Sequence, residues 1–498
     1  MPEPGICVDF DIIRRFSPIQ GQISNGDELA IIAVGEGNAP LSAHPPQPDS
    51  IQSCQRHRIA VITYSRRIFH SSMPTSSAPR SALPLFTTLS VMMFLLFFTW
   101  GAWFAGLGRF MFDAGFSAKA IGNAYSCTPI AAIVTPFFIG IFADRFMNAE
   151  RLQGILMILG AIFVAAAPSF ADPENPTIFI GLLLAHSLCF MPTLGLSNTI
   201  CLKHLSDAER DYPRVRIFAT LGWIAAGLAI SFVFNYDTSV NQCYVAAAAS
   251  LVVGIYSFFL PQTPPPARGE KVSFGDLLGT GTLPYFKKFS FAVFLFASLL
   301  VCCAFMPYWV NLGAFLGQAG MEKTTAFLTW GQVAELPVLF FVLPIFLKKF
   351  GIKWTMIIGI SCWILRYFVF AAAAGSLADG AVLQGSITWL VLFGVLLHGF
   401  SYDFVFVSGY LYVDRHVDEK IRAQAQGLLT VFTQGIAFLI SSQVLCGYYA
   451  TKIMGDEASF AEWKQFWMLP VAYLFVILVL FALLFHEKKP VAGKPVEG

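Results

Sequence analysis

Charged residues are scarce in this chain of 498 residues. Asp, Glu, Lys and Arg make up 12% of it, about half of the roughly 25% that is typical of soluble domains. Hydrophobic residues reach 56%, which excludes an ordinary soluble protein. The net charge is only +2, and no cluster of Lys and Arg lies on an aromatic surface. We therefore expect no nucleic-acid partner.

The sequence also lacks the patterns of catalytic and metal sites. Eight of the ten cysteines fall in or beside apolar runs without metal-ligand or redox spacing, so they read as small core residues. No phosphate-binding glycine loop, His-x-x-x-His pair or nucleophile elbow fits the long apolar runs. We expect neither an enzyme nor a metal or organic cofactor.

What the sequence has in abundance is apolar runs long enough to cross a bilayer, at about 20 to 25 residues each. They predict an all-α membrane protein with twelve transmembrane helices in two six-helix halves. The predicted spans are 84–108, 118–143, 152–171, 177–200, 216–235, 241–260, 289–316, 325–347, 352–374, 383–412, 421–450 and 465–485. The halves cover 81–261 and 289–486, joined by a cytoplasmic linker at 262–288 that is rich in proline.

Both ends of the chain differ from this membrane body. Residues 1–80 are rich in Pro, Ser, Gln and charge, and their longest apolar stretch is too short for a span. We expect them to form a disordered extension, and Met73 is a plausible alternative start. Residues 487–498 are expected to form a cytoplasmic tail.

The loops give an orientation and a repeat. Lys and Arg gather in alternate loops, which places both termini in the cytoplasm. The loop after the second span contains Asp144 and Arg145, and the corresponding loop of the second half contains Lys348 and Lys349. This pattern resembles the major facilitator superfamily, with two six-helix halves around a central site. Asp144 and Arg145 are expected to act as a conformational loop.

Ionisable residues inside a span usually face a cavity. Glu335 lies mid-span and shares a helix face with Gln332. It is either a neutral residue that bonds two helices or a proton-carrying carboxyl, since burial favours the neutral form. Asp403 is turned about 100° from Tyr402, which shares a stripe with His398. Proton coupling by Asp403 competes with a buried structural hydrogen bond.

Two arginines lie at or in the spans. Arg216, Thr220 and Trp223 share one helix face and combine a cation, a hydroxyl and an aromatic surface, which favours substrate binding over a purely topological role. Arg366 is expected to pair structurally with a carboxylate between helices, and Glu335 and Asp403 are the candidates.

A set of tracts spread from about Leu89 to the last span resembles the bacterial nucleoside:proton symporter family. The most specific tract runs from Met191 to Ile200. The others are Tyr125-Ser126 with Ile130-Ala131-Ala132, the Asp144 loop, Arg216-Ile217, Gln332 with Glu335, Phe350–Lys353, Trp363–Arg366, Asp403-Phe404 with Ser408-Gly409, and Ile421–Gly427. The order of these tracts along the chain strengthens the resemblance.

The resemblance implies a substrate site. Arg216, Thr220, Gln332, Glu335 and Asp403 match the family's binding residues in type. Three positions differ, because Trp223 and Tyr402 stand where the family has Phe and His398 stands where it has Tyr. Two helix-seven amides of the family fall on Met306 and Trp309 here, and Asn311 is the nearest amide. Substrate specificity is therefore the property that these departures affect most.

We expect a protein that imports nucleosides by proton symport with alternating access, in the bacterial inner membrane and as a monomer. The predicted binding residues are Arg216, Thr220, Trp223, Trp309, Asn311, Gln332, Glu335, His398 and Tyr402. Glu335 and Asp403 are the predicted coupling residues, and the proton is the coupling ion. Transport of another polar metabolite, such as a sugar, remains an alternative, and a membrane sensor that transports nothing is a third reading.

Overall fold

The computed structural model describes residues 82–142, 146–265, 280–418, 421–453 and 458–487. The predicted disordered extension at 1–80 lies outside the described residues. Asp144 and Arg145 lie outside them as well, as do most of the predicted linker and all but the first residue of the predicted tail.

The regular elements of the described residues are all helices, as the sequence predicts, and they divide into two groups. The first group contains α2 (Ala82–Asp113), α3 (Ala118–Phe142), α4 (Ala149–Ala166) with η4 (Ala167–Phe170), α5 (Thr177–His204), α6 (Ala208–Leu228) with η5 (Ala229–Phe234), and α7 (Gln242–Ser257). The second group contains η6 (Thr280–Lys287), α9 (Phe289–Cys302), α10 (Phe305–Gln318), α11 (Thr324–Leu328), α12 (Trp330–Pro337), η7 (Val338–Val342), α13 (Leu343–Gly375), α14 (Gly385–Leu396), α15 (His398–His416), α16 (Arg422–Thr430), η9 (Val431–Ile436), α17 (Ala437–Ile440), η10 (Ser441–Tyr449), α18 (Ala450–Ile453) and α19 (Phe460–Leu484).

Nine helical segments in the described part of the chain are long and apolar enough to cross a membrane. Their ends lie within a few residues of most of the predicted spans, apart from the start of the fifth. The segment Thr324–Gly375 covers two predicted spans and contains a break at Gly351, whose φ of 76° is not helical. A side chain at this position would be strained, so glycine permits the chain to change direction between the two spans.

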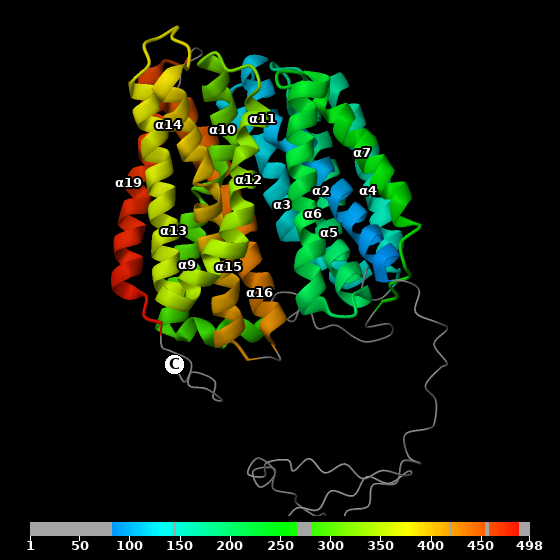
Figure 1. The fold of residues 1–498 in the computed structure, drawn as a ribbon. Helices are drawn as coiled ribbons and strands as arrows, with labels where there is room; N and C mark the ends of the chain where they lie inside the picture. Colours follow the sequence, from blue (N-terminus) through cyan, green and yellow to red (C-terminus); the bar gives the residue numbers. More distant parts are fainter. Residues whose placement is uncertain (1–81, 143–145, 266–279, 419–420, 454–457, 488–498) are drawn as a thin grey trace, which may run out of the picture. The chain divides into compact units, whose positions relative to one another are not determined.

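Each group is held together by close helix packing. In the first group α2 packs against α6 and α7, and α4 packs against α5 and α7. In the second group α13 packs against both α15 and α19. Figure 1 shows α2–α7 gathered beside α10–α16 and α19. At the contact of α2 with α6, a Cβ on Gly222 would lie 2.1 Å from the Phe94 carbonyl oxygen. Only glycine therefore permits these two backbones to approach so closely.

The two groups contact each other mainly at one end, which we call the closed end: the C-termini of α2, η5 and α10 and the N-termini of α3 and α11. There α2 packs against α10, and α3 packs against η10. The Gln443 amide donates to Asn123 Oδ1 at 2.9 Å and to Ser126 Oγ at 2.7 Å. Towards the other end, α9, α15 and α16 make no comparable contact with the first group in the described residues. The groups therefore separate towards that end.

A polar latch joins the groups at the closed end. Asp237 follows η5 and is only 4% exposed. Its Oδ1 accepts hydrogen bonds from Ser231 Oγ and from the backbone N–H of Thr325, both at 2.8 Å. Ser231 Oγ in turn accepts from the N–H of Ala326 at 2.9 Å. Residues of the first group thus satisfy backbone donors at the start of α11, which the helix itself cannot satisfy.

Candidate functional site

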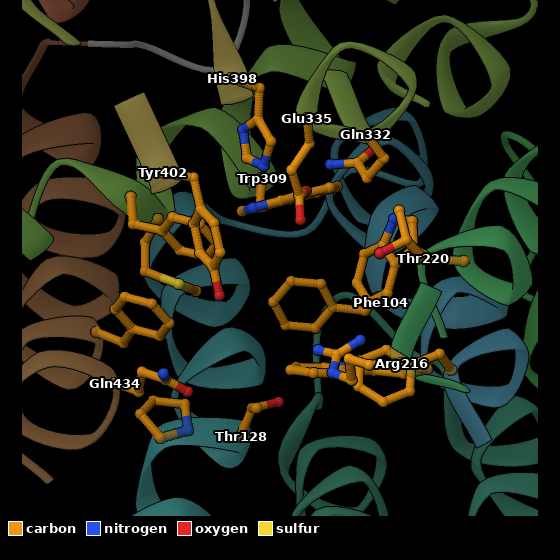
Figure 2. Close-up of a pocket in the computed structure, with 17 residues that line it drawn as sticks. Phe104, Thr128, Arg216, Thr220, Trp309, Gln332, Glu335, His398, Tyr402 and Gln434 are labelled. Atoms are coloured by element: carbon orange, nitrogen blue, oxygen red, sulfur yellow. The ribbon is translucent and has the colours of Figure 1, made fainter. Parts of the chain in front are cut away.

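A cavity of about 120 Å³ lies between the two groups of helices. Its walls come from α2, α3 and α6 on one side and from α10, α12, α15, η9 and α17 on the other. The lining residues are Phe97, Trp100, Phe104, Thr128, Pro129, Arg216, Thr220, Trp223, Phe305, Met306, Trp309, Gln332, Glu335, His398, Tyr402, Gln434 and Phe438. Figure 2 shows ten of these side chains labelled around a common space.

The cavity collects all but one of the predicted binding residues. Those that line it are Arg216, Thr220, Trp223, Trp309, Gln332, Glu335, His398 and Tyr402. Asn311 is buried on α10 but is not among the lining residues. Asp403 is also buried, directly beside Tyr402 and outside the lining. The roles of all these residues remain predictions, including those of Asp144 and Arg145.

Arg216 and Glu335 are the two charged side chains of the lining. The Arg216 guanidinium carbon lies 4.4 Å from the centre of the Phe97 ring, a favourable cation–π distance. Neither Arg216 nor Glu335 forms an ion pair of 4.0 Å or less within the described residues. Both groups are thus placed to interact with a ligand, and the Glu335 carboxyl can exchange a proton with the cavity.

Glu335 lies where the regular helix ends. Pro337, two residues later, has no N–H to donate, and the chain continues as the π-helical segment η7. Such π segments are frequent at functional sites, because the wider turn leaves backbone groups and side chains in unusual positions. Gln332 precedes Glu335 by one turn and is 5% exposed. The two side chains lie side by side at one end of the cavity (Figure 2).

Aromatic rings form the walls between the polar groups. The rings of Trp100 and Trp223 meet edge to face at 5.3 Å, and those of Trp223 and Trp309 at 5.2 Å. Phe305 and Phe438 stack at 4.5 Å with only 2° between their planes. Rings that pack against one another in this way keep fixed orientations, so they offer flat surfaces on which a planar ligand can stack.

A column of rings links the cavity to a buried arginine. His398 stacks on Tyr402 at 5.7 Å and on Tyr308 at 5.2 Å. The guanidinium of Arg366 lies 4.6 Å from the centre of the Tyr308 ring, and its Nε donates to the Gly394 carbonyl at 3.1 Å. The predicted pairing of Arg366 with a carboxylate is wrong, because no described carboxylate lies within 4.0 Å of it. A ring face and a backbone oxygen take the place of the expected counter-ion.

Several buried polar atoms of the lining have no hydrogen-bond partner among the described residues. They are Trp100 Nε1, Trp309 Nε1, Gln332 Oε1, His398 Nδ1 and Thr128 Oγ1. Buried polar groups are nearly always bonded, and each exception calls for a reason. Here the shared reason is that all five residues line one cavity, so a polar ligand can supply the bonds.

Thr128 and Gln434 were not predicted from the sequence. Neither is ionisable, and ionisable residues are the stronger indication of a cavity inside a span. A hydroxyl and an amide in the middle of apolar segments are also unfavourable in a bilayer unless they are bonded. Thr128 also stands directly before Pro129, which has no N–H to donate to the Tyr125 carbonyl one turn earlier. These two signals were present in the sequence.

Tyr125 connects three helices beside the cavity through hydrogen bonds of its hydroxyl group. Its hydroxyl accepts from the N–H of Gly108 at 2.9 Å and donates to the carbonyl of Phe104 at 2.7 Å. Those two groups are the partners of one helical hydrogen bond, so the hydroxyl lies between them in the α2 ladder. The Trp309 carbonyl is 3.3 Å from the same hydroxyl. One buried side chain thereby joins α2, α3 and α10 directly beside the cavity.

Metal-binding geometry is not found here: in the parts of the chain that the structure describes, no three His, Cys, Asp or Glu side chains gather into a group that could hold a metal ion. The polar groups of the cavity are instead a cation, a carboxyl, amides, hydroxyls and an imidazole. This set suits an uncharged, polar and partly aromatic ligand.

Comparison with known proteins agrees with a polar, partly aromatic ligand, because similar proteins are named for the transport of nucleosides. A family model described as nucleoside H⁺ symporter matches residues 84–490. The putative nucleoside transporter YegT of Escherichia coli is 37% identical over 417 residues, 80% of this chain and 93% of that protein. The xanthosine permease of the same organism is 31% identical over 410 residues, covering 79% and 94%. The crystal structure of the nucleoside transporter NupG matches with a TM-score of 0.71 at 29% identity, over 81% of this chain and 100% of that one.

Proposed function

Since the chain belongs to the nucleoside H⁺ symporter family, we propose how its cavity performs proton-coupled nucleoside import. The protein is a multi-pass transporter of the bacterial inner membrane and not an enzyme, and the proton is its coupling ion. The observation that carries the proposal is the cavity between the two groups, where a cation, a carboxyl and an amide face packed aromatic rings. A nucleoside has matching parts, a flat base for the rings and ribose hydroxyls for the polar groups.

We propose twelve transmembrane helices in two six-helix halves. Nine spans follow from length and composition. Dividing Thr324–Gly375 at Gly351 adds a tenth. The 25-residue α3 and the shorter apolar helix α7 bring the number to twelve. The monomer remains the proposed working unit.

We propose further that both termini are cytoplasmic. The excess of Lys and Arg in alternate loops supports this orientation. The closed end then faces the periplasm, and the end at which the groups separate faces the cytoplasm. The structure would thus represent the state that releases substrate inwards, and alternating access would require the closed end to open.

Glu335 and Asp403 are the proposed coupling carboxyls. Glu335 faces the cavity without an ion-pair partner, so substrate binding and proton binding can influence each other there. Asp403 Oδ2 is buried and has no hydrogen-bond partner among the described residues, and its neighbour Tyr402 lines the cavity. A carboxyl in such a place is more stable when it carries a proton.

Uptake into proteoliposomes tests this function. The wild-type protein should accumulate labelled uridine when the exterior is acidic, and a protonophore should abolish the accumulation. Unlabelled nucleosides should compete, whereas maltose and raffinose should not. Competition by the sugars alone would favour the alternative substrate class, and absence of any flux would contradict transport.

Coupling is tested separately with Glu335→Gln and Asp403→Asn. We expect at least one of them to lose gradient-driven accumulation and to keep exchange of labelled for unlabelled uridine. Glu174→Gln, at an exposed carboxyl between η4 and α5, is the matched control and should behave as the wild type. Unchanged accumulation in both test variants would refute the coupling assignment.

A further inference from the structure

We propose that Thr128 and Gln434 form a second polar subsite in the cavity, which hydrogen-bonds the edge of the nucleobase and contributes to the choice of substrate. The inference rests on the nucleoside transport described above. It concerns two residues from opposite groups of helices, Thr128 on α3 and Gln434 on η9, and both line the cavity.

Thr128 has a hydroxyl that its own helix does not use. Thr and Ser inside a helix commonly bond to the carbonyl four residues earlier. On the same helix, Ser126 bonds to Gly122 at 2.7 Å and Thr135 bonds to Ala131 at 2.8 Å. Thr128 is 5% exposed, and its Oγ1 has no partner among the described residues. Its hydroxyl is therefore available to a ligand in the cavity.

The side-chain amide of Gln434 forms one hydrogen bond, which orients it, and has further donor and acceptor capacity. Its Nε2 lies 3.4 Å from the hydroxyl of Tyr410, which is 2.9 Å from Thr430 Oγ1. Thr430 also donates to the Gln426 carbonyl at 3.0 Å. This chain of bonds engages one N–H of the amide and leaves its oxygen and second N–H for other partners. Because Gln434 lies in the π-helical segment η9, it also shares the type of local geometry that follows Glu335.

The cavity has two polar ends. In Figure 2, Gln332, Glu335 and His398 lie at one end, and Thr128 and Gln434 lie at the opposite end with their polar atoms towards the open space. Aromatic side chains of the lining stand between the two ends. A nucleoside also has two polar parts, the ribose hydroxyls and the hydrogen-bonding edge of the base, separated by the body of the ring. With the ribose at Gln332 and Glu335, the base edge extends towards Thr128 and Gln434.

The chemistry of the other walls supports this division. On α10 the lining residues are Phe305, Met306 and Trp309, and the indole N–H is the only strong hydrogen-bonding group of their side chains. A base edge presents a donor and an acceptor side by side, and an amide supplies the complementary acceptor and donor. Gln434 offers both in one group, and the Thr128 hydroxyl can act as either.

The test is binding by the purified full-length chain, measured by calorimetry with three probes. Uridine and inosine carry a polar base edge, whereas the C-riboside of benzene has the ribose and an aromatic ring but no such edge. We expect Thr128→Val and Gln434→Leu each to raise the Kd for uridine and inosine about tenfold, as for one lost hydrogen bond. The Kd for the benzene riboside should change less than twofold.

Two further variants separate binding from structure. Thr128→Ser keeps the hydroxyl and should bind as the wild type. Thr433→Val is the matched control, because Thr433 is next to Gln434 and bonds only to the Leu429 carbonyl at 2.7 Å among the described residues. The melting temperature of each variant without ligand reports folding.

Three outcomes would overturn the proposal. Equal loss of affinity for all three probes would assign the two residues a structural role, and unchanged affinity for uridine and inosine would remove them from the site. A wild-type protein that binds neither nucleoside would contradict the transport function itself and this inference with it. The wild-type measurement therefore distinguishes failure of the function from failure of the subsite.

Discussion

The latch at Asp237 should control how often the closed end opens. Its carboxylate accepts two hydrogen bonds of 2.8 Å, and one of them comes from a backbone N–H of the opposite group. Replacing Asp237 with Ala leaves the Ser231 hydroxyl and the Thr325 N–H without this acceptor in the closed state. In an open state, water can bond to both groups, so the substitution destabilises the closed state selectively.

The magnitude follows from the two bonds. A hydrogen bond to a charged group stabilises by about 1.5–3 kcal/mol, so two give an upper limit of about 3–6 kcal/mol. The carboxylate also loses water when it is buried to 4% exposure, and this desolvation offsets part of the gain. A net change of about 1.5–3 kcal/mol shifts the ratio of open to closed molecules by about ten- to one-hundredfold.

Spin-label distances measured by pulsed electron resonance can detect this shift. Ala114 follows α2 and Ala378 follows α13; both are exposed at the closed end and can be replaced by labelled cysteines in a background with Cys7→Ser, Cys54→Ser, Cys189→Ser and Cys362→Ser, which keeps only the buried cysteines. We expect a longer distance to gain population in Asp237→Ala. Asp172→Ala is the control, since Asp172 is exposed and, among the residues that the structure describes, its Oδ1 accepts only from the nearby Glu174 N–H. A distance distribution equal to that of the wild type, in a folded variant, would refute the reasoning.

Three other substitutions test the same architecture. Gly122→Val should also open the closed end in the spin-label assay, because even a Cβ there would lie 2.5 Å from the Ser442 carbonyl oxygen; an unchanged distance would contradict the close packing of α3 on η10. Tyr125→Phe should lower the melting temperature by about 1–2 °C, as for about 1 kcal/mol of lost bonding to α2 and α10 in a chain of this size, and an unchanged value would mean that α2 closes its own ladder without loss. Trp309→Phe should raise the Kd for nucleosides about tenfold or more by calorimetry, because the indole N–H and part of a buried ring surface are lost together; equal affinity would exclude that donor from binding.

The helices themselves were predictable, because each requires only a long apolar run. The break between two adjoining spans was predicted near its true position, because polar residues around Gly351 interrupt the apolar pattern. The positive φ of that glycine could not be predicted from the sequence. The fifth helix was predicted to start at 216, yet α6 begins at Ala208. Asp207 caps this start by accepting from the Arg210 N–H at 3.0 Å, so the helix extends beyond its apolar part.

The site was predictable where residues share one helix face. Arg216, Thr220 and Trp223 follow this spacing and lie together in the cavity. Asn311 does not line the cavity, because two residues after Trp309 it is turned by about 200° and lies on another side of α10. Thr128 and Gln434 could not be paired from the sequence, since no local pattern tells which face of one group meets the other.

The closed end also determines how the protein responds to its surroundings. Every ion pair of 4.0 Å or less in the described residues joins residues of the same group. The contacts between the groups are instead hydrogen bonds, several of them buried, and close backbone approaches such as that of Gly122. Dissolved salt screens exposed charges strongly and buried hydrogen bonds weakly. Closure should therefore depend only weakly on ionic strength.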